Sequence, residues 1–239
     1  MSGALIVEKE LSLTARDLEI MEMIGVFGGK TSSPVLEKTF WHGKSFPANQ
    51  ARRRMDTLRK KGLLKHKPTG LISPRNIYIP TAAGRELIYD RFGIELSGTP
   101  HFSLATFQHN ATEQIAWYWL RRVGKDPKRA IVRRWSPDHK HTPDLYYEGP
   151  RGLVYVEIEI SKKRPDSYIS IFNKMREDGI HAVLYIFENE KRMKQIGRVL
   201  PAWGSRVHFT NLDRLIGAKS LSEAAVRQED FILQLGENQ

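Results

Sequence analysis

Three acidic residues, Asp144, Glu157 and Glu159, have the spacing best suited to chemistry in this sequence. The two glutamates alternate with Ile158 and Ile160, which is the pattern of a strand with one apolar face. Carboxylates gathered on one face of a sheet repel one another and raise each other's pKa unless a cation lies among them. Hard oxygen ligands of this kind suit Mg²⁺ or Mn²⁺. The sequence therefore predicts a divalent metal site.

The carboxylates come together only if the chain folds back on itself between them. Residues 145–147 and 153–160 are predicted to form two antiparallel strands, because residues 149–152, Gly-Pro-Arg-Gly, are typical of a turn. A turn centred within that segment places Asp144 opposite Glu157, where facing Cβ atoms are about 5 Å apart. The second glutamate emerges on the same face, two residues further along.

A simpler alternative is a half-exposed ribbon whose outer face is merely acidic, since alternating Glu and Ile is common in amphipathic strands. The overall charge of the chain argues against it. The formal net charge is +11 and the pI is near 9.8, so a dense acidic spot needs an explanation.

Composition limits the classes of protein that this chain can belong to. At 239 residues it is long enough for one large or two small domains, and 40% apolar with 27% charged residues is ordinary globular composition. We find no apolar run of membrane-spanning length and no secretory leader pattern, so we expect a cytoplasmic protein without a membrane partner. Zero cysteines exclude disulfides, thiolate metal sites and a cysteine nucleophile. The positive charge favours a nucleic acid partner.

Much of that charge lies in the first hundred residues. Between Lys44 and Arg75 there are ten Lys or Arg residues and one acid, Asp56. Helix signals begin at Thr14, at Ser33-Pro34 and at Pro47, two short strands follow, and a last helix begins at Thr81. This order predicts a winged helix-turn-helix domain over residues 1–97, with its third helix, residues 47–61, entering a major groove.

The predicted DNA contacts are polar and basic residues on the outward face of that third helix and on the hairpin after it. They are Asn49, Gln50, Arg52, Arg53, Lys60, Lys65, Lys67 and Arg75. The alternative is a basic helix that is only a solvated face.

Residues 98–239 are predicted to form a second domain of helices alternating with strands. Helices are expected at residues 106–123, 165–177 and 191–200, and strands, besides the acidic hairpin, at residues 130–135, 182–187 and 207–209. The fold class is therefore α/β or α+β, with a mixed sheet flanked by helices.

Pro143-Asp144 opening the second strand and Glu157-x-Glu159 on the third resemble the PD-(D/E)XK superfamily of restriction-endonuclease-like proteins. The resemblance implies that Asp144 and Glu157 bind a divalent cation that activates water or a hydroxyl group against a phosphodiester. The last motif position is usually lysine, whereas here it is Glu159; this departure occurs in active members and in inactive relatives. Candidates for a relocated lysine are Lys162, Lys163 and Lys174.

A winged helix followed by such a domain resembles the MOBC class of relaxases, which nick the transfer origin of mobilizable plasmids; the N-terminal half also resembles replication-relaxation proteins. In this resemblance His109-Asn110 and Glu113 match an upstream motif, so His109 is expected to contact DNA and Glu113 to reach the metal. Tyr168 is a candidate covalent nucleophile. Expected partners are the double-stranded plasmid origin, single-stranded DNA after nicking, and an accessory mobilization or coupling protein.

Two other functions remain open from the sequence. One is a non-catalytic DNA-binding regulator of plasmid replication or transcription on a degenerate nuclease fold, which the missing motif lysine favours. The other is a restriction or repair nuclease. The segment Asp138-His139-Lys140-His141 is predicted to line the DNA cleft as a loop, although His and Asp side chains at this spacing also suit Zn²⁺ or Ni²⁺.

Overall fold

The computed structural model describes residues 12–96, 104–129, 138–161, 163–200 and 206–231. The protein is mixed α/β, as predicted, and divides into two compact units, Met1–Gln114 and Ile115–Gln239. The predicted boundary at residues 97 and 98 lies outside the described residues. The division between the units falls within helix α6, Leu104–Arg122, whose first part belongs to the N-terminal unit.

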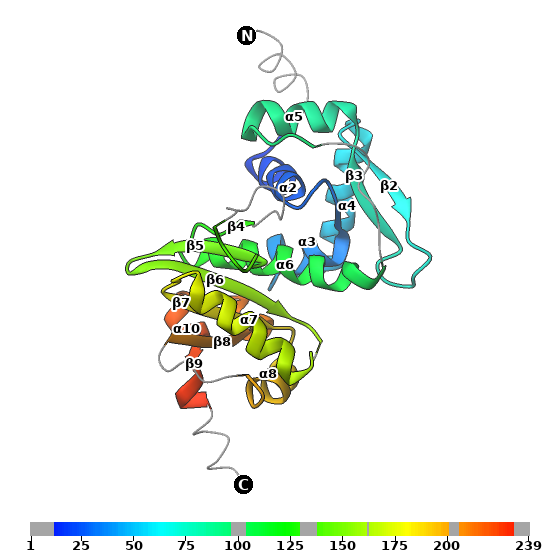
Figure 1. Ribbon diagram of the computed structural model, residues 1–239. Helices are drawn as coiled ribbons and strands as arrows, with labels where there is room; N and C mark the ends of the chain where they lie inside the picture. The colour runs from blue at the N-terminus through cyan, green and yellow to red at the C-terminus, as the bar shows by residue number, and fades with distance from the viewer. Residues whose placement is uncertain (1–11, 97–103, 130–137, 162, 201–205, 232–239) are drawn as a thin grey trace. The chain divides into compact units, whose positions relative to one another are not determined.

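The N-terminal unit combines helices with a small antiparallel sheet of order β1-β3-β2 (Figure 1). Its strands are β1 (Thr31–Ser32), β2 (Leu64–Pro68) and β3 (Asn76–Pro80). Its helices before α6 are α2 (Ala15–Val26), α3 (Ser33–Phe40), α4 (Pro47–Lys60) and α5 (Ala82–Phe92). The helix starts follow the sequence signals, because Thr14 and Thr81 cap α2 and α5 with their side chains and α3 and α4 carry proline in their first turn.

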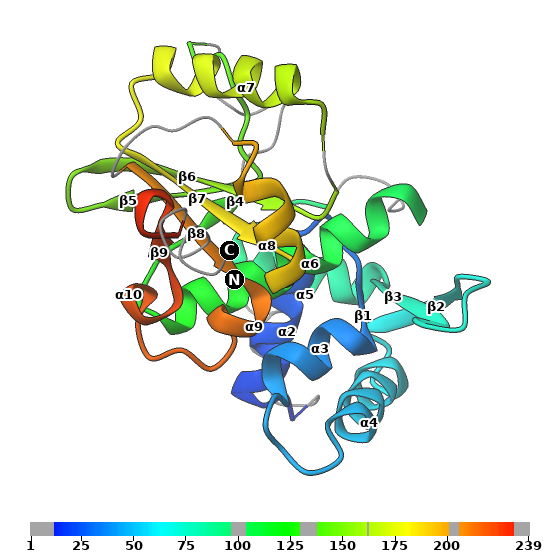
Figure 2. The same ribbon diagram turned by 90° about the horizontal axis from the view of Figure 1, so that it is seen from below.

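Helix α4 is amphipathic in the way its sequence predicts. It buries Ala51, Met55 and Leu58 in the core of the N-terminal unit. Within this unit the β2–β3 hairpin projects away from the helices, and its loop forms the tip (Figure 2).

The second unit contains a six-stranded sheet of order β4-β5-β6-β7-β8-β9, in which β6, β7 and β8 are parallel and the other pairs are antiparallel. The strands are β4 (Lys128–Arg129), β5 (Leu145–Gly149), β6 (Gly152–Glu159), β7 (Ala182–Phe187), β8 (Val207–Asn211) and β9 (Val226–Arg227). The helices are α7 (Pro165–Glu177), α8 (Glu190–Gly197), α9 (Leu212–Leu215) and α10 (Leu221–Ala224). The strand predicted at residues 130–135 lies outside the described residues.

The hairpin register is the one that the turn predicts. Leu145 pairs with Val156 and Gly149 with Gly152, so Asp144 lies where the register continues to Glu157. Strand β6 is not the half-exposed ribbon of the simpler alternative, because every residue from Val154 to Glu159 is buried.

Helices α7 and α8 cover one face of the sheet. Their buried Tyr168, Phe172 and Met193 share a cluster with Tyr155 of β6 and Tyr185 of β7. Glu157 and Glu159 lie on the same face as Tyr155 because strand residues two apart point to the same side. The acidic residues of β6 are therefore covered by protein.

Candidate active site

Glu157 is a buried carboxylate at the centre of this site. It is 6% exposed, and its Oε1 atom lies 2.8 Å from Nε2 of His141. Its pKa is raised to about 7, mainly by burial and also by the nearby charge of Asp144, whereas the hydrogen bond to His141 and the charge of Lys163 oppose the rise. An additional positive charge placed beside this buried carboxylate would stabilise its ionised form.

Asp144 is fixed next to Glu157 by the backbone of the neighbouring strand. The amide nitrogen of Ile158 donates to Oδ2 of Asp144 over 2.7 Å. This contact holds the aspartate, which lies just before β5, against β6 and places its negative charge near Glu157. The hairpin thus brings together two of the four carboxylates that are predicted from the sequence as metal ligands.

Glu159 is only 2% exposed, and its Oε1 atom forms an ion pair with the ammonium of Lys163. The hydroxyl of Tyr168 lies 3.5 Å from the other carboxylate oxygen, Oε2, and accepts a 3.0 Å hydrogen bond from the backbone nitrogen of Lys163. Of the two proposed lysines that the structure describes, Lys163 and Lys174, the first reaches the cluster. Lys174 is exposed on α7, and Lys162 lies outside the described residues.

Tyr168 occupies a packing position in this arrangement. Its side chain is 1% exposed, and burial raises the pKa of its hydroxyl, as does the charge of Glu159. A raised pKa makes the phenolate nucleophile harder to form. Its observed contacts are those of a residue that positions Lys163 and Glu159.

Asp178, the C-cap residue of α7, holds the loop before Asp144 in place through hydrogen bonds. The Asp178 carboxylate accepts hydrogen bonds from the backbone nitrogens of Lys140 and His141, the latter over 3.1 Å. It also accepts one from the Tyr155 hydroxyl over 3.2 Å, and that hydroxyl contacts Nδ1 of His139. These contacts hold the imidazole of His141 beside Glu157.

The donor set fits a cation such as Mg²⁺, which commonly binds one or two carboxylates and completes its shell with water or substrate phosphates. Asp144 and Glu157 supply those two carboxylates. In the described part of the chain, no three His, Asp or Glu side chains form a group that would hold a metal by themselves. Glu159 already has Lys163 as its partner, and its role as a metal ligand stays a prediction.

Two predicted site residues lie on α6 in the N-terminal unit. Glu113 is 3% exposed and His109 is half-buried, and each makes interactions within the structure. Their contribution to metal or DNA binding stays a prediction.

The predicted DNA contacts are accessible as a group. Seven of them are exposed, namely Asn49, Arg52, Arg53, Lys60, Lys65, Lys67 and Arg75. Gln50 is half-buried, and its Nε2 atom donates to the carbonyl of Ser45 over 2.6 Å. Arg54 differs from its two neighbours, because it forms an ion pair with the fully buried Asp17.

The sequence predicts His141 only as part of a loop that lines the DNA cleft, and it assigns no role to Asp178. The closeness of His141 to Asp144, three residues further on, is the signal that points to its contact with Glu157. No sequence pattern links Asp178 to the site, because its contacts join segments 37 and 38 residues apart in the chain.

No family model, no curated protein and no solved structure matches this chain. Among the described residues, no helix combines the length and the apolar character needed to cross a membrane.

Proposed function

We propose that this protein is a Mg²⁺- or Mn²⁺-dependent DNA endonuclease of the relaxase type, which nicks one strand at a plasmid transfer origin. The observation that carries the proposal is the meeting of Asp144, just before β5, with the buried Glu157 of the adjacent strand β6. A buried carboxylate with a raised pKa beside a second carboxylate is typical of sites that bind a cation or handle protons.

Asp144 and Glu157 would hold the ion, which polarises the scissile phosphate and lowers the pKa of bound water. His141 orients Glu157 through the 2.8 Å contact. Lys163 would supply a positive charge near the site, in place of the lysine that is usual at the last motif position of PD-(D/E)XK nucleases. Since the pKa of Lys163 is raised, it acts as a cation that offsets developing charge rather than as a base.

Site recognition is assigned to the N-terminal unit as a winged helix-turn-helix. The support is its element order, with a basic α4 before a projecting hairpin, together with the exposed Arg52 and Arg53. Basic side chains that contact phosphates provide affinity, whereas base edges read by residues such as Asn49 provide specificity. The expected partners remain the plasmid origin, the single strand released by nicking, and an accessory mobilization or coupling protein.

A second candidate is a DNA-binding regulator on an inactive nuclease fold. The specific observation in its favour is that Glu159 occupies the motif lysine position and is bound by Lys163. Such a protein would bind the origin and leave the DNA intact.

The test is incubation of the protein with supercoiled plasmid from its own replicon, with and without Mn²⁺. We expect open-circular product only with metal, and its loss in Asp144→Asn and Glu157→Gln. Asp144→Asn is chosen because the amide oxygen can still accept from Ile158 while the charge is removed. Glu148→Gln, on the exposed end of β5, is the matched control and should nick normally.

Origin binding without nicking, in wild type and variants alike, would replace the nuclease by the regulator. Cleavage of both strands would favour a restriction or repair enzyme.

A further inference from the structure

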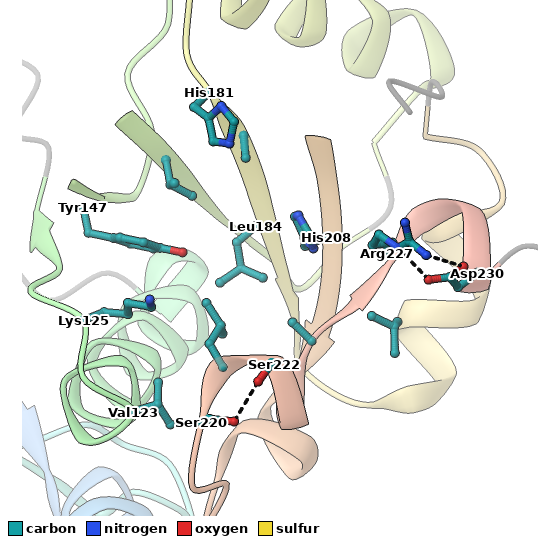
Figure 3. A pocket seen from close by; sticks show the side chains of 15 residues that line it. Val123, Lys125, Tyr147, His181, Leu184, His208, Ser220, Ser222, Arg227 and Asp230 are labelled. Carbon is teal, nitrogen blue, oxygen red and sulfur yellow. Dashed lines mark hydrogen bonds and ion pairs between the residues drawn. The ribbon is translucent and has the colours of Figure 1, made fainter. Parts of the chain in front are cut away.

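A cavity of about 940 Å³ opens on the face of the sheet opposite the carboxylate cluster, within the second unit (Figure 3). Its floor is apolar and includes Val154 of β6 with Ala182 and Leu184 of β7. Strand alternation separates these residues from Glu157, which points to the α7 face. The cavity is therefore distinct from the proposed nuclease site.

The walls of the cavity carry polar groups on both sides of this floor. Figure 3 shows Lys125 and Tyr147 on one side of Leu184 and His208 on the other, with His181 near the top of the view. Ser220 and Ser222 of the α10 segment add hydroxyl groups, which are 3.0 Å apart. An apolar floor with a few convergent polar groups, in a volume between about 300 and 1,000 Å³, is typical of small-molecule sites.

The charge that lines the cavity is positive. Asp230 is the one acidic residue in the described lining, and Arg227 binds both of its oxygens, over 2.8 and 3.2 Å. The Lys125 ammonium lies 5.6 Å from the centre of the Tyr147 ring, and within the described ranges no carboxylate forms an ion pair with it. Lys125 is thus a cation beside an aromatic ring and an apolar floor, which favours a ligand that combines an anionic group with an apolar body.

We propose that this cavity binds a nucleoside monophosphate, with the phosphate against Lys125 and the base over Leu184. The Tyr147 hydroxyl would donate to a phosphate oxygen, because burial raises its pKa to about 12 and keeps it protonated. The imidazoles of His181 and His208 would meet the polar edge of the base. This inference is independent of the nuclease function.

Calorimetric titration of the full-length protein with AMP and with dTMP tests the proposal. Adenosine and inorganic phosphate serve as half-ligands that carry only the ring or only the charge. We expect a monophosphate to bind with a Kd of about 1 mM or below. Each half-ligand should have a Kd at least about tenfold higher.

Lys125→Gln should weaken monophosphate binding at least about tenfold. The matched control is Lys128→Gln, an exposed lysine three residues away that does not line the cavity and should bind as wild type does. Ser222→Trp fills the cavity from an exposed position, so it should block binding without unfolding the domain.

No heat from either monophosphate, equal loss in the two lysine variants, or unchanged binding in Ser222→Trp would each overturn the proposal. Loss of folding in Lys125→Gln, seen by circular dichroism, leaves Ser222→Trp to decide the question.

Discussion

The ammonium of Lys163 pairs with the buried carboxylate of Glu159, four residues earlier in the chain. Burial by itself would lower the pKa of Lys163, but the charge and hydrogen bond of Glu159, together with the charges of Glu157 and Tyr168, outweigh burial and raise the pKa. A glutamate at the motif position and a lysine just beyond it thus place an amine next to the strand that carries Glu157. In the proposed nuclease, this pairing would compensate for the glutamate that stands where the motif usually has lysine.

Removing the charge of Lys163 should show how much its ion pair with Glu159 stabilises the folded protein. Lys163→Met leaves a carboxylate that is 2% exposed without its cation, and we expect a loss of about 1–3 kcal/mol in the free energy of unfolding. This loss is smaller than that for a fully buried pair because the lysine side chain is 36% exposed. Urea denaturation measures it. The double variant Glu159→Gln with Lys163→Met should recover most of the loss, and a double variant as unstable as the single one would contradict the pairing.

The raised pKa of Glu157 predicts that the free energy of unfolding depends on pH. Its pKa is about 7 in the folded protein against an ordinary value of 4.5, so the folded state binds the proton more tightly than the unfolded state. The free energy of unfolding should therefore fall as pH rises from about 4.5 to 7 and then level off. Glu157→Gln should remove this contribution and stabilise the metal-free protein at pH 8 by about 1–3 kcal/mol, and by little at pH 4. The exposed Glu148→Gln should show no such trend; an identical trend in both variants would place the effect elsewhere.

Three consecutive arginines on α4 should separate stability from DNA binding. Arg54→Ala leaves the fully buried Asp17 without its ion-pair partner and should cost about 2–3 kcal/mol of unfolding free energy. Arg52→Ala and Arg53→Ala are exposed changes that should alter stability by less than about 0.5 kcal/mol.

Replacement of the exposed Arg52 or Arg53 should weaken DNA binding more directly than replacement of Arg54. Removal of one arginine that binds a phosphate should reduce the slope of log affinity against log salt by about one. Fluorescence anisotropy with a labelled origin duplex at several salt concentrations measures this slope. An unchanged slope in the Arg52 and Arg53 double variant would move the DNA surface away from α4.

Gly84, near the start of α5, should not tolerate a side chain. A Cβ atom there would lie 2.1 Å from the carbonyl oxygen of Leu63, which accepts a 3.0 Å hydrogen bond from the backbone of Thr81. Since backbone would have to move, we expect Gly84→Ala to lower the free energy of unfolding by about 1–3 kcal/mol. The neighbouring Ala83→Ser, at an exposed position, is the control and should be close to neutral in thermal unfolding.

Several local elements of this protein follow from the sequence alone, whereas the short strands β1, β4 and β9 do not. Helix α7 and strand β7 have the predicted bounds, because a proline starts the helix and an uninterrupted apolar run defines the strand. The β5–β6 register is also determined locally, because a short turn permits few pairings of its two strands. That register is enough to predict that Asp144 and Glu157 meet.

The state of those carboxylates is decided only by tertiary structure. The alternation of Glu and Ile in β6 is the same whether its acidic face is bare or covered, and only the packing of other segments against that face buries Glu157 and Glu159. Burial removes water from a charge, so it sets the pKa and makes the partners His141 and Lys163 necessary. Glu159 and Lys163 are only four residues apart, but other contacts of this kind join distant segments, as in the pairing of Asp17 with Arg54, and no local spacing encodes those. The sequence places the acidic side chains on one strand face, and the fold determines which charges they meet there.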